Sequence, residues 1–161
     1  LGGVAGGLVL ERALRGETTV TDDTGTISVT VPHEWERAVS PAGWQPPNDS
    51  DAFPALSIGT SKMWAEAQRA SDQGVFVGIL PGDELPTRVP RHPECAGELT
   101  AVTDDLDGDP SMTTVYTQCP TGVTVERVVQ ITDNRLLWVQ VRSAERGTAN
   151  AVLDSVDLSG I

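Results

Sequence analysis

The chain has 161 residues, of which 39% are hydrophobic, so it can form one substantial core but not two comfortable domains. Its 11 basic and 23 acidic residues give a formal net charge of -12. Because such a surface repels polyanions, the charge argues against nucleic acid and bare anionic membrane as partners. Lys62 is the single lysine, and the preference for arginine, with the high Ala, Gly, Asp and Val content, is typical of actinobacterial proteins.

The opening segment, Leu1 to Leu10, is apolar apart from its glycines and ends at Glu11 and Arg12. A helix that spans a bilayer needs about 20 apolar residues, so this run is too short to cross alone. Its texture is that of the end of a transmembrane or signal segment, with a mobile arm as the alternative. We therefore expect residues 1–17 to be a tail and residues 18–161 to form one extracytoplasmic domain, tethered to the membrane only through that tail.

The first half of the body predicts three strands and one helix. Ile27, Val29 and Val31 alternate with Ser28 and Thr30, a half-buried strand that Pro32 ends. A long proline-rich connection, Glu34 to Pro54, carries Trp35 and Trp44. The pattern next predicts a strand over Ala55–Gly59, a helix over Ser61–Ala70 with Met63 and Trp64 on its apolar face, and a strand over Val75–Leu80 that is covered on both faces.

The second half is typical of an antiparallel meander that ends in a helix. The expected strands are Leu99–Thr103, Thr113–Gln118, Val123–Thr132 and Leu136–Arg142, with turns at Asp107-Gly108 and Asp133-Asn134. A helix is expected over Ala149–Val156. This order indicates an α+β fold, a largely antiparallel sheet flanked by helices. The expected core residues are Val77, Ile79, Val129, Ile131, Trp138, Val152 and Leu153.

Cys95 and Cys119 are the only cysteines. In an oxidising compartment a pair with this separation favours a disulfide, which in the chain-entropy model contributes roughly 3 to 4 kcal/mol. The alternatives are two buried thiols, or a zinc site that combines His92 and Cys95 with Cys119 and His33. The zinc interpretation lacks the second closely spaced ligand pair that structural sites normally have.

The strand Ile27-Ser-Val-Thr-Val-Pro32 followed by Trp35, the later paired hairpins and the helix after Leu137-Trp138-Val139 resemble the PsbP-like superfamily. That superfamily includes an extrinsic photosystem II protein, a nuclear Ran-binding protein and many actinobacterial lipoproteins and membrane-anchored domains. The resemblance covers roughly Thr18 to Ile161 and rests on element order and one short motif. It implies a PsbP-like fold and a non-catalytic binding or scaffold domain, and it transfers no functional residue.

The residues themselves indicate neither a catalytic nor a cofactor motif. The two histidines, His33 and His92, adjoin prolines, so we expect both to be exposed loop residues. The sequence holds no nucleophile elbow, phosphate loop or dinucleotide fingerprint. Asp105, Asp107 and Asp109 have the alternating spacing of a calcium loop, but the loop is incomplete, Pro110 follows at once, and an Asp-Gly turn between strands is the ordinary explanation. We therefore expect no cofactor and no enzymatic activity.

The leading hypothesis is an extracytoplasmic sensor, ligand-binding or protein-interaction domain whose partner is an unidentified protein or small molecule. The alternative is a secreted hydrolase that uses acidic active-site residues. Trp35 and Trp44 could line a groove, although tryptophans in a long connection more often anchor it to the core. An apolar groove would favour the first hypothesis, and two facing acids in a cleft the second.

Overall fold

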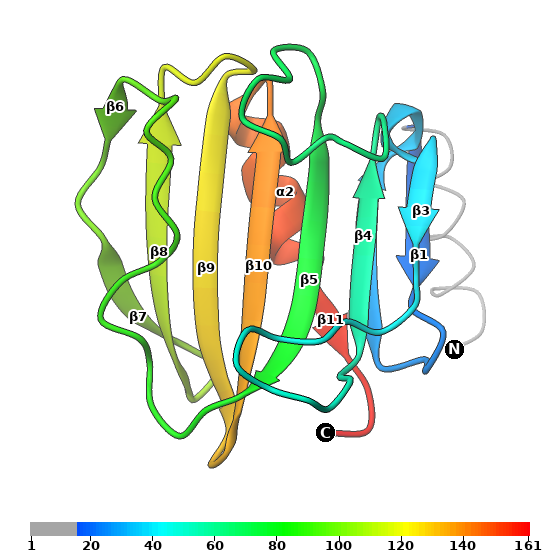
Figure 1. Ribbon diagram of the computed structural model, residues 1–161, viewed down its shortest axis with the longest axis vertical. Coiled ribbons are helices and arrows are strands. Elements are labelled where there is room, and N and C mark those ends of the chain that lie inside the picture. Colours follow the sequence, from blue (N-terminus) through cyan, green and yellow to red (C-terminus); the bar gives the residue numbers. More distant parts are fainter. Residues whose placement is uncertain (1–15) are drawn as a thin grey trace, which may run out of the picture.

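The computed structural model describes residues 16–161, which form two antiparallel sheets and one α-helix (Figure 1). The large sheet has the order β3-β4-β5-β10-β9-β8-β6, and β7 also pairs with β8. Its strands are β3 (Ala38–Ser40), β4 (Ala55–Gly59), β5 (Gly74–Pro81), β6 (Gly97–Glu98), β7 (Val102–Leu106), β8 (Asp109–Thr117), β9 (Val123–Thr132) and β10 (Arg135–Ser143).

A second layer lies on one face of this sheet, which we call the inner face. It consists of the small sheet β1-β2-β11 and of α2 (Arg146–Asp154), which contacts β10, β9 and β2. The small-sheet strands are β1 (Glu17–Thr21), β2 (Ile27–Pro32) and β11 (Asp157–Leu158). The hydrophobic core fills the space between the layers, and it includes Ile27, Val29, Val31, Trp35, Leu56, Ile58, Val75, Val77, Val125, Val139, Val141 and Val152.

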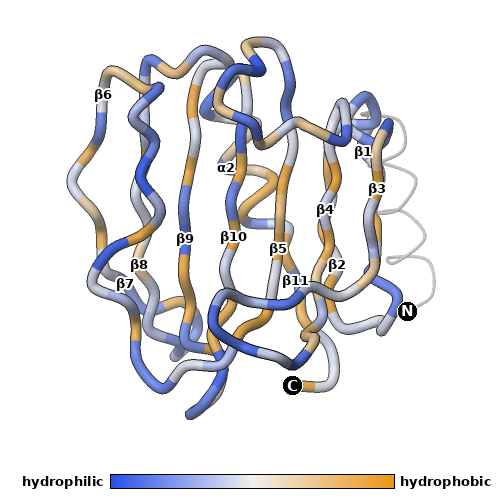
Figure 2. Tube along the Cα trace, viewed as in Figure 1, coloured by the Kyte–Doolittle hydropathy of each residue, from blue (hydrophilic) through white to orange (hydrophobic). Residues whose placement is uncertain are grey.

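The alternation of side chains along the strands separates the inner face from the opposite, outer face. In β10, Leu137, Val139 and Val141 belong to the core, so Trp138 and Gln140 point outward. Figure 2 shows apolar residues along β2, β4 and β5, whereas polar and apolar residues alternate along β9. The large sheet is therefore apolar on its inner face and mixed on its outer face.

The α+β fold with a largely antiparallel sheet is confirmed, and several element bounds agree with expectation. The strands over Ala55–Gly59 and Val123–Thr132 occur as predicted. The Asp107-Gly108 turn joins β7 to β8, with positive φ values of 52° and 93° that suit a tight hairpin. The expected anchor at Leu1 to Leu10 lies outside the described residues. Within residues 16–161, no helix is both long and apolar enough to cross a membrane.

The predicted helix over Ser61–Ala70 is wrong, because this segment folds as a series of turns. The carbonyls of Trp64, Ala65 and Glu66, which a helix would use internally, instead accept hydrogen bonds from the Arg142 guanidinium at 3.0, 3.2 and 2.5 Å. Tertiary contacts thus replace the helical hydrogen bonds that the apolar periodicity suggested.

The side chain of Trp64 holds this segment against the large sheet. Its indole ring packs on Gly59 and Gly74, a cross-strand pair of β4 and β5, where an added Cβ would overlap the ring. The indole Nε1 donates to Ser57 Oγ at 3.1 Å, and only 3% of Trp64 is exposed. The two glycines leave a flat surface on the outer face that accommodates the indole ring. Trp64, which the apolar pattern placed on a helix, therefore anchors a loop to the sheet.

Trp138 also differs from its expected place in the core. It is partly exposed on the outer face, where it packs against Phe76 and Trp44 with ring centroids 5.1 and 5.7 Å away. The other expected core residues are buried on the inner side, with Ile131 partly buried at its edge.

Candidate functional site

A buried polar cluster lies on the outer face, beneath the connection between β5 and β6. It is centred on Glu126 of β9, whose exposed fraction is 0%, and we call it the Glu126 cluster. One carboxylate oxygen accepts from His92 Nε2 at 2.7 Å and from Gln140 Nε2 at 2.5 Å. The other accepts from Trp138 Nε1 at 2.5 Å. The members are His92, Glu94, Glu126, Trp138, Gln140 and Arg142.

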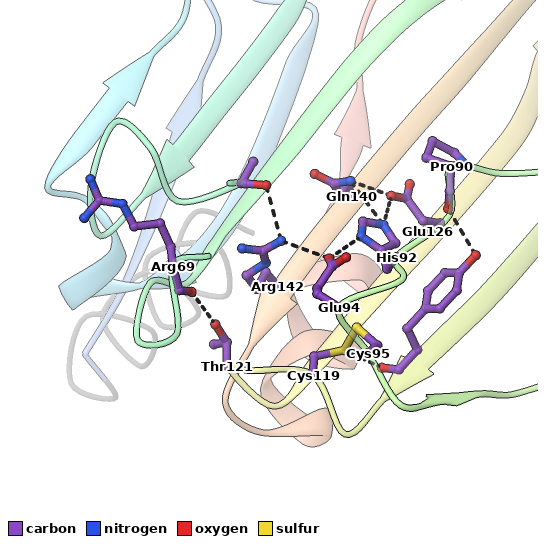
Figure 3. Close-up of a disulfide and its surroundings, with 12 residues drawn as sticks. Arg69, Pro90, His92, Glu94, Cys95, Cys119, Thr121, Glu126, Gln140 and Arg142 are labelled. Carbon is purple, nitrogen blue, oxygen red and sulfur yellow. Dashed lines mark hydrogen bonds and ion pairs between the residues drawn. A yellow bond between two sulfur atoms is a disulfide. The ribbon is translucent and has the colours of Figure 1, made fainter. Parts of the chain in front are cut away.

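Both ring nitrogens of His92 are engaged, because Nδ1 contacts Glu94 Oε1 at 2.9 Å while Nε2 contacts Glu126 (Figure 3). Burial opposes the charged imidazolium, but the hydrogen bonds and charges of Glu126 and Glu94 outweigh it and raise the pKa of His92 above its ordinary 6.5. The expectation that His92 is an exposed loop residue is therefore wrong, since only 9% of it is exposed.

Glu94 connects this pair to Arg142. Arg142 Nη2 lies 3.6 Å from Glu94 Oε1 and also donates to the Ala65 carbonyl, while Nη1 donates to the carbonyls of Trp64 and Glu66. Burial would raise the pKa of Glu94, but its own backbone N–H, His92 and Arg142 lower it overall. The cluster thus joins the β4–β5 connection and the β5–β6 connection to the outer face of the large sheet.

The Cys95–Cys119 disulfide is formed next to the cluster, with an S–S distance of 2.05 Å (Figure 3). The backbone N–H of Cys95 donates to the His92 carbonyl at 3.0 Å, and Tyr116 donates its hydroxyl to the Pro90 carbonyl at 3.0 Å. With both sulfurs bonded to each other, neither is a zinc ligand. Residues 90–95 are therefore fixed by a covalent bond and by buried hydrogen bonds together.

The Glu126 cluster contains an imidazole between two carboxylates, and its hydrogen bonds join the connection between β5 and β6 to β9. Glu94 and Glu126 occupy opposite nitrogens of the same ring, and Glu126 is fully buried. A general base must reach its substrate's proton directly or through one water. Both nitrogens of His92 and both carboxylate oxygens of Glu126 are already bonded within the protein. The cluster is therefore a support for the loops that cover the sheet.

The predicted calcium residues are on the exposed β7–β8 hairpin and do not converge. Asp105 Oδ1 accepts the Gly108 backbone N–H at 2.6 Å, as in an ordinary Asx turn, and Asp107 occupies the turn itself. Asp109, the first residue of β8, pairs with Leu106, the last residue of β7. Residues 16–161 contain no group of three or more His, Cys, Asp or Glu side chains arranged to hold a metal.

The other singled-out residues are dispersed. His33 is exposed and lies 3.1 Å from Thr18 Oγ1, on the small sheet. Trp35 is 1% exposed in the core, whereas Trp44 lies with Phe76 and Trp138 on the outer face and donates to the Ile79 carbonyl at 2.8 Å. The two tryptophans anchor their connection to different faces of the large sheet, so they do not line one groove.

Two hollows open on the inner side. The larger, about 760 Å³, lies between β1, β2 and α2 and is lined by four acidic residues, Glu17, Glu34, Glu145 and Asp154. The smaller, about 250 Å³, lies between α2 and strands β7, β8 and β9, and we call it the β7–α2 groove. Its lining includes two arginines, Arg127 and Arg146, and the apolar side chains of Leu99, Val102, Leu106 and Val115.

No protein-family model matches the sequence, and no curated protein is similar to it. Among solved structures, the chain is similar to the cyanobacterial PsbP (CyanoP) of Synechocystis sp. PCC 6803, with 12% sequence identity and a TM-score of 0.47. That match covers 89% of this chain and 93% of the other chain.

Proposed function

We propose that this domain acts by binding, as an extracytoplasmic sensor, ligand-binding or protein-interaction domain of a membrane-tethered bacterial protein. The observation that carries the proposal is the β7–α2 groove, whose lining combines four apolar side chains with polar and charged side chains from β7, β8, β9 and α2. Small-molecule sites likewise join apolar surface to polar groups that fix the orientation of the ligand.

The Cys95–Cys119 disulfide supports the extracytoplasmic part of the proposal. Disulfides form and persist in oxidising compartments and are rare in the reducing cytosol. Trapping free thiols in intact cells with a maleimide reagent, before lysis, tests this part. We expect the full-length protein to resist labelling until it is reduced, and two labelled thiols without reduction would contradict an oxidising location.

The His92–Glu126 pair supports a binding role over the alternative of a secreted hydrolase. Both side chains are buried, and their hydrogen bonds join the connection that contains His92 to β9. The domain thus uses its best-placed titratable groups to hold loops, which leaves the open groove on the other face for a ligand.

A substrate screen tests the non-catalytic part. The purified domain is assayed on panels of hydrolase and transferase substrates beside the variants Asp105→Ala, Asp107→Ala, His33→Ala and His92→Ala. We expect no turnover above that of a mock preparation. Turnover that one substitution abolishes, in a variant whose circular dichroism and thermal midpoint are unchanged, would establish an enzyme.

A further inference from the structure

The floor of the β7–α2 groove is an uncovered part of the inner face. Thr113 pairs with Arg127 on one side and Val102 on the other, so these three residues form one row across β9, β8 and β7. Side chains in such a row point to the same face. Since α2 packs over β9 and β10, the row continues beyond the helix into the groove, where all three residues belong to the lining.

Arg127 is incompletely paired. Its Nε donates to Thr113 Oγ1 at 2.9 Å, the one hydrogen bond that its side chain makes within the described part of the chain. No carboxylate in that part lies within 4.0 Å of its guanidinium, although Asp154 and Asp104 act on it from further away. Burial is the largest influence on Arg127 and lowers its pKa. A half-buried guanidinium with one neutral partner gains from an anionic acceptor.

Arg146 adds a second positive charge from the other wall. It is the exposed first residue of α2, and Asn150, one turn later, also lines the groove. The lining contains one carboxylate, Asp104, whose Oδ1 accepts the Asp105 backbone N–H at 2.8 Å. In a chain of net charge -12, the lining of this groove holds two arginines and one carboxylate, and Asp154 acts on Arg127 from outside the lining.

The rim of the groove is apolar and open to solvent. Val102 and Leu99 are 60% and 42% exposed, and they are among the most exposed large hydrophobic residues in residues 16–161. Leu106 and Val115 extend the apolar surface inward. A hydrocarbon group on this rim would remove apolar area from water, which favours binding.

The size of the groove limits the ligand. Its volume of about 250 Å³ is smaller than that of the sites that hold drug-sized ligands. We propose that the β7–α2 groove binds a small organic anion in which a carboxylate is joined to a short hydrocarbon chain. The carboxylate pairs with Arg127 and Arg146, and the chain lies on Leu99 and Val102. This inference rests on the proposed binding function and names its ligand class.

Calorimetric titration with octanoate tests the inference, with octanol and acetate as probes that each carry half of the proposed features. We expect octanoate to bind more tightly than either. Arg127→Gln should weaken octanoate binding about tenfold or more, because it removes a charge-assisted pair, while Arg127→Lys keeps part of the affinity. Arg37→Gln, an exposed arginine beside β3, is the matched control and should bind as the unaltered protein does.

Several outcomes would overturn the inference. These are an absence of octanoate binding, equal affinities for octanoate and octanol, and an Arg127→Gln variant that folds normally and binds octanoate undiminished. Binding of acetate or inorganic phosphate as tight as that of octanoate would also overturn it, since the site would then recognise an ion alone. None of these outcomes produces turnover, so failure of the ligand assignment is distinguishable from failure of the non-catalytic proposal.

Discussion

Replacement of Glu126 tests whether the cluster named after it holds the outer face together. Glu126→Ala removes a fully buried carboxylate that accepts from His92, Trp138 and Gln140. Three donors would then lack an acceptor in a space that the loops cover. Removal of one partner from a buried charged pair costs about 3 to 5 kcal/mol, and each orphaned donor accounts for about 1 to 3 kcal/mol of such a loss.

We therefore expect Glu126→Ala to lower the free energy of unfolding by about 3 to 5 kcal/mol. Urea unfolding, followed by tryptophan fluorescence, measures this change. With a slope of about 2 kcal/mol per molar urea, the midpoint should fall by roughly 2 M. Glu126→Gln keeps the volume and one acceptor oxygen, so it should cost less than Glu126→Ala.

Glu84→Ala is the matched control, because Glu84 is an exposed glutamate in the connection that covers the cluster. This substitution should change the free energy of unfolding by less than about 0.5 kcal/mol. A double-mutant cycle between Glu126→Ala and His92→Ala isolates the pair, and its coupling should exceed about 1 kcal/mol. A Glu126→Ala loss as small as that of Glu84→Ala would refute the reasoning.

Three further predictions follow from neighbouring features. Because the pKa of His92 is raised in the folded state, its contribution to stability is complete below its ordinary value of 6.5 and declines as pH rises above it. The urea midpoint of the unaltered protein should therefore fall relative to that of His92→Gln as the pH rises above 6.5, and a constant difference would contradict this. Loss of the disulfide in the double variant Cys95→Ser/Cys119→Ser should cost roughly 3 to 4 kcal/mol in the same assay, and an unchanged midpoint would show that the bond adds no stability. Gly122→Ala should destabilise the domain by more than about 1 kcal/mol, because Gly122 has φ 149° and an added Cβ would lie 2.5 Å from the Ala144 carbonyl oxygen. Gly147→Ala, with nothing within 4 Å of the added carbon, is its control and should not destabilise, whereas equal losses would contradict the steric explanation.

The strands of the large sheet could be predicted because their patterns are local. Val123–Thr132 is rich in valine and threonine and lies between two turn signals, so its bounds need no tertiary information. The Ser61–Ala70 segment has an equally clear helical pattern. Its carbonyls nevertheless accept hydrogen bonds from Arg142, and Trp64 packs on Gly59 and Gly74. Those partners are distant in the sequence, and periodicity cannot show them.

The candidate sites were harder to predict for the same reason. Alternation in β9 does place Thr124, Glu126 and Gln130 on the same face as Val128, and polar side chains on a strand face that other segments cover indicate a partner there. The partner, His92, is 34 positions earlier, in a proline-rich connection that has no periodic pattern. The β7–α2 groove likewise combines Arg127 with the first residue of a helix that follows the next strand, so only the folded arrangement reveals it.

The most direct test of the central claim, that this domain binds its ligand on the inner side of the large sheet, is a residue-by-residue map of backbone amide shifts in a 15N-labelled sample titrated with octanoate. We predict that the largest shifts fall on β7, β8, β9 and the first turn of α2, around Val102, Arg127 and Arg146. The chemical shifts of the His92 and Glu94 amides, on the outer face, should not change. Shifts concentrated on the outer face, or no saturable shifts around Arg127, would contradict the account.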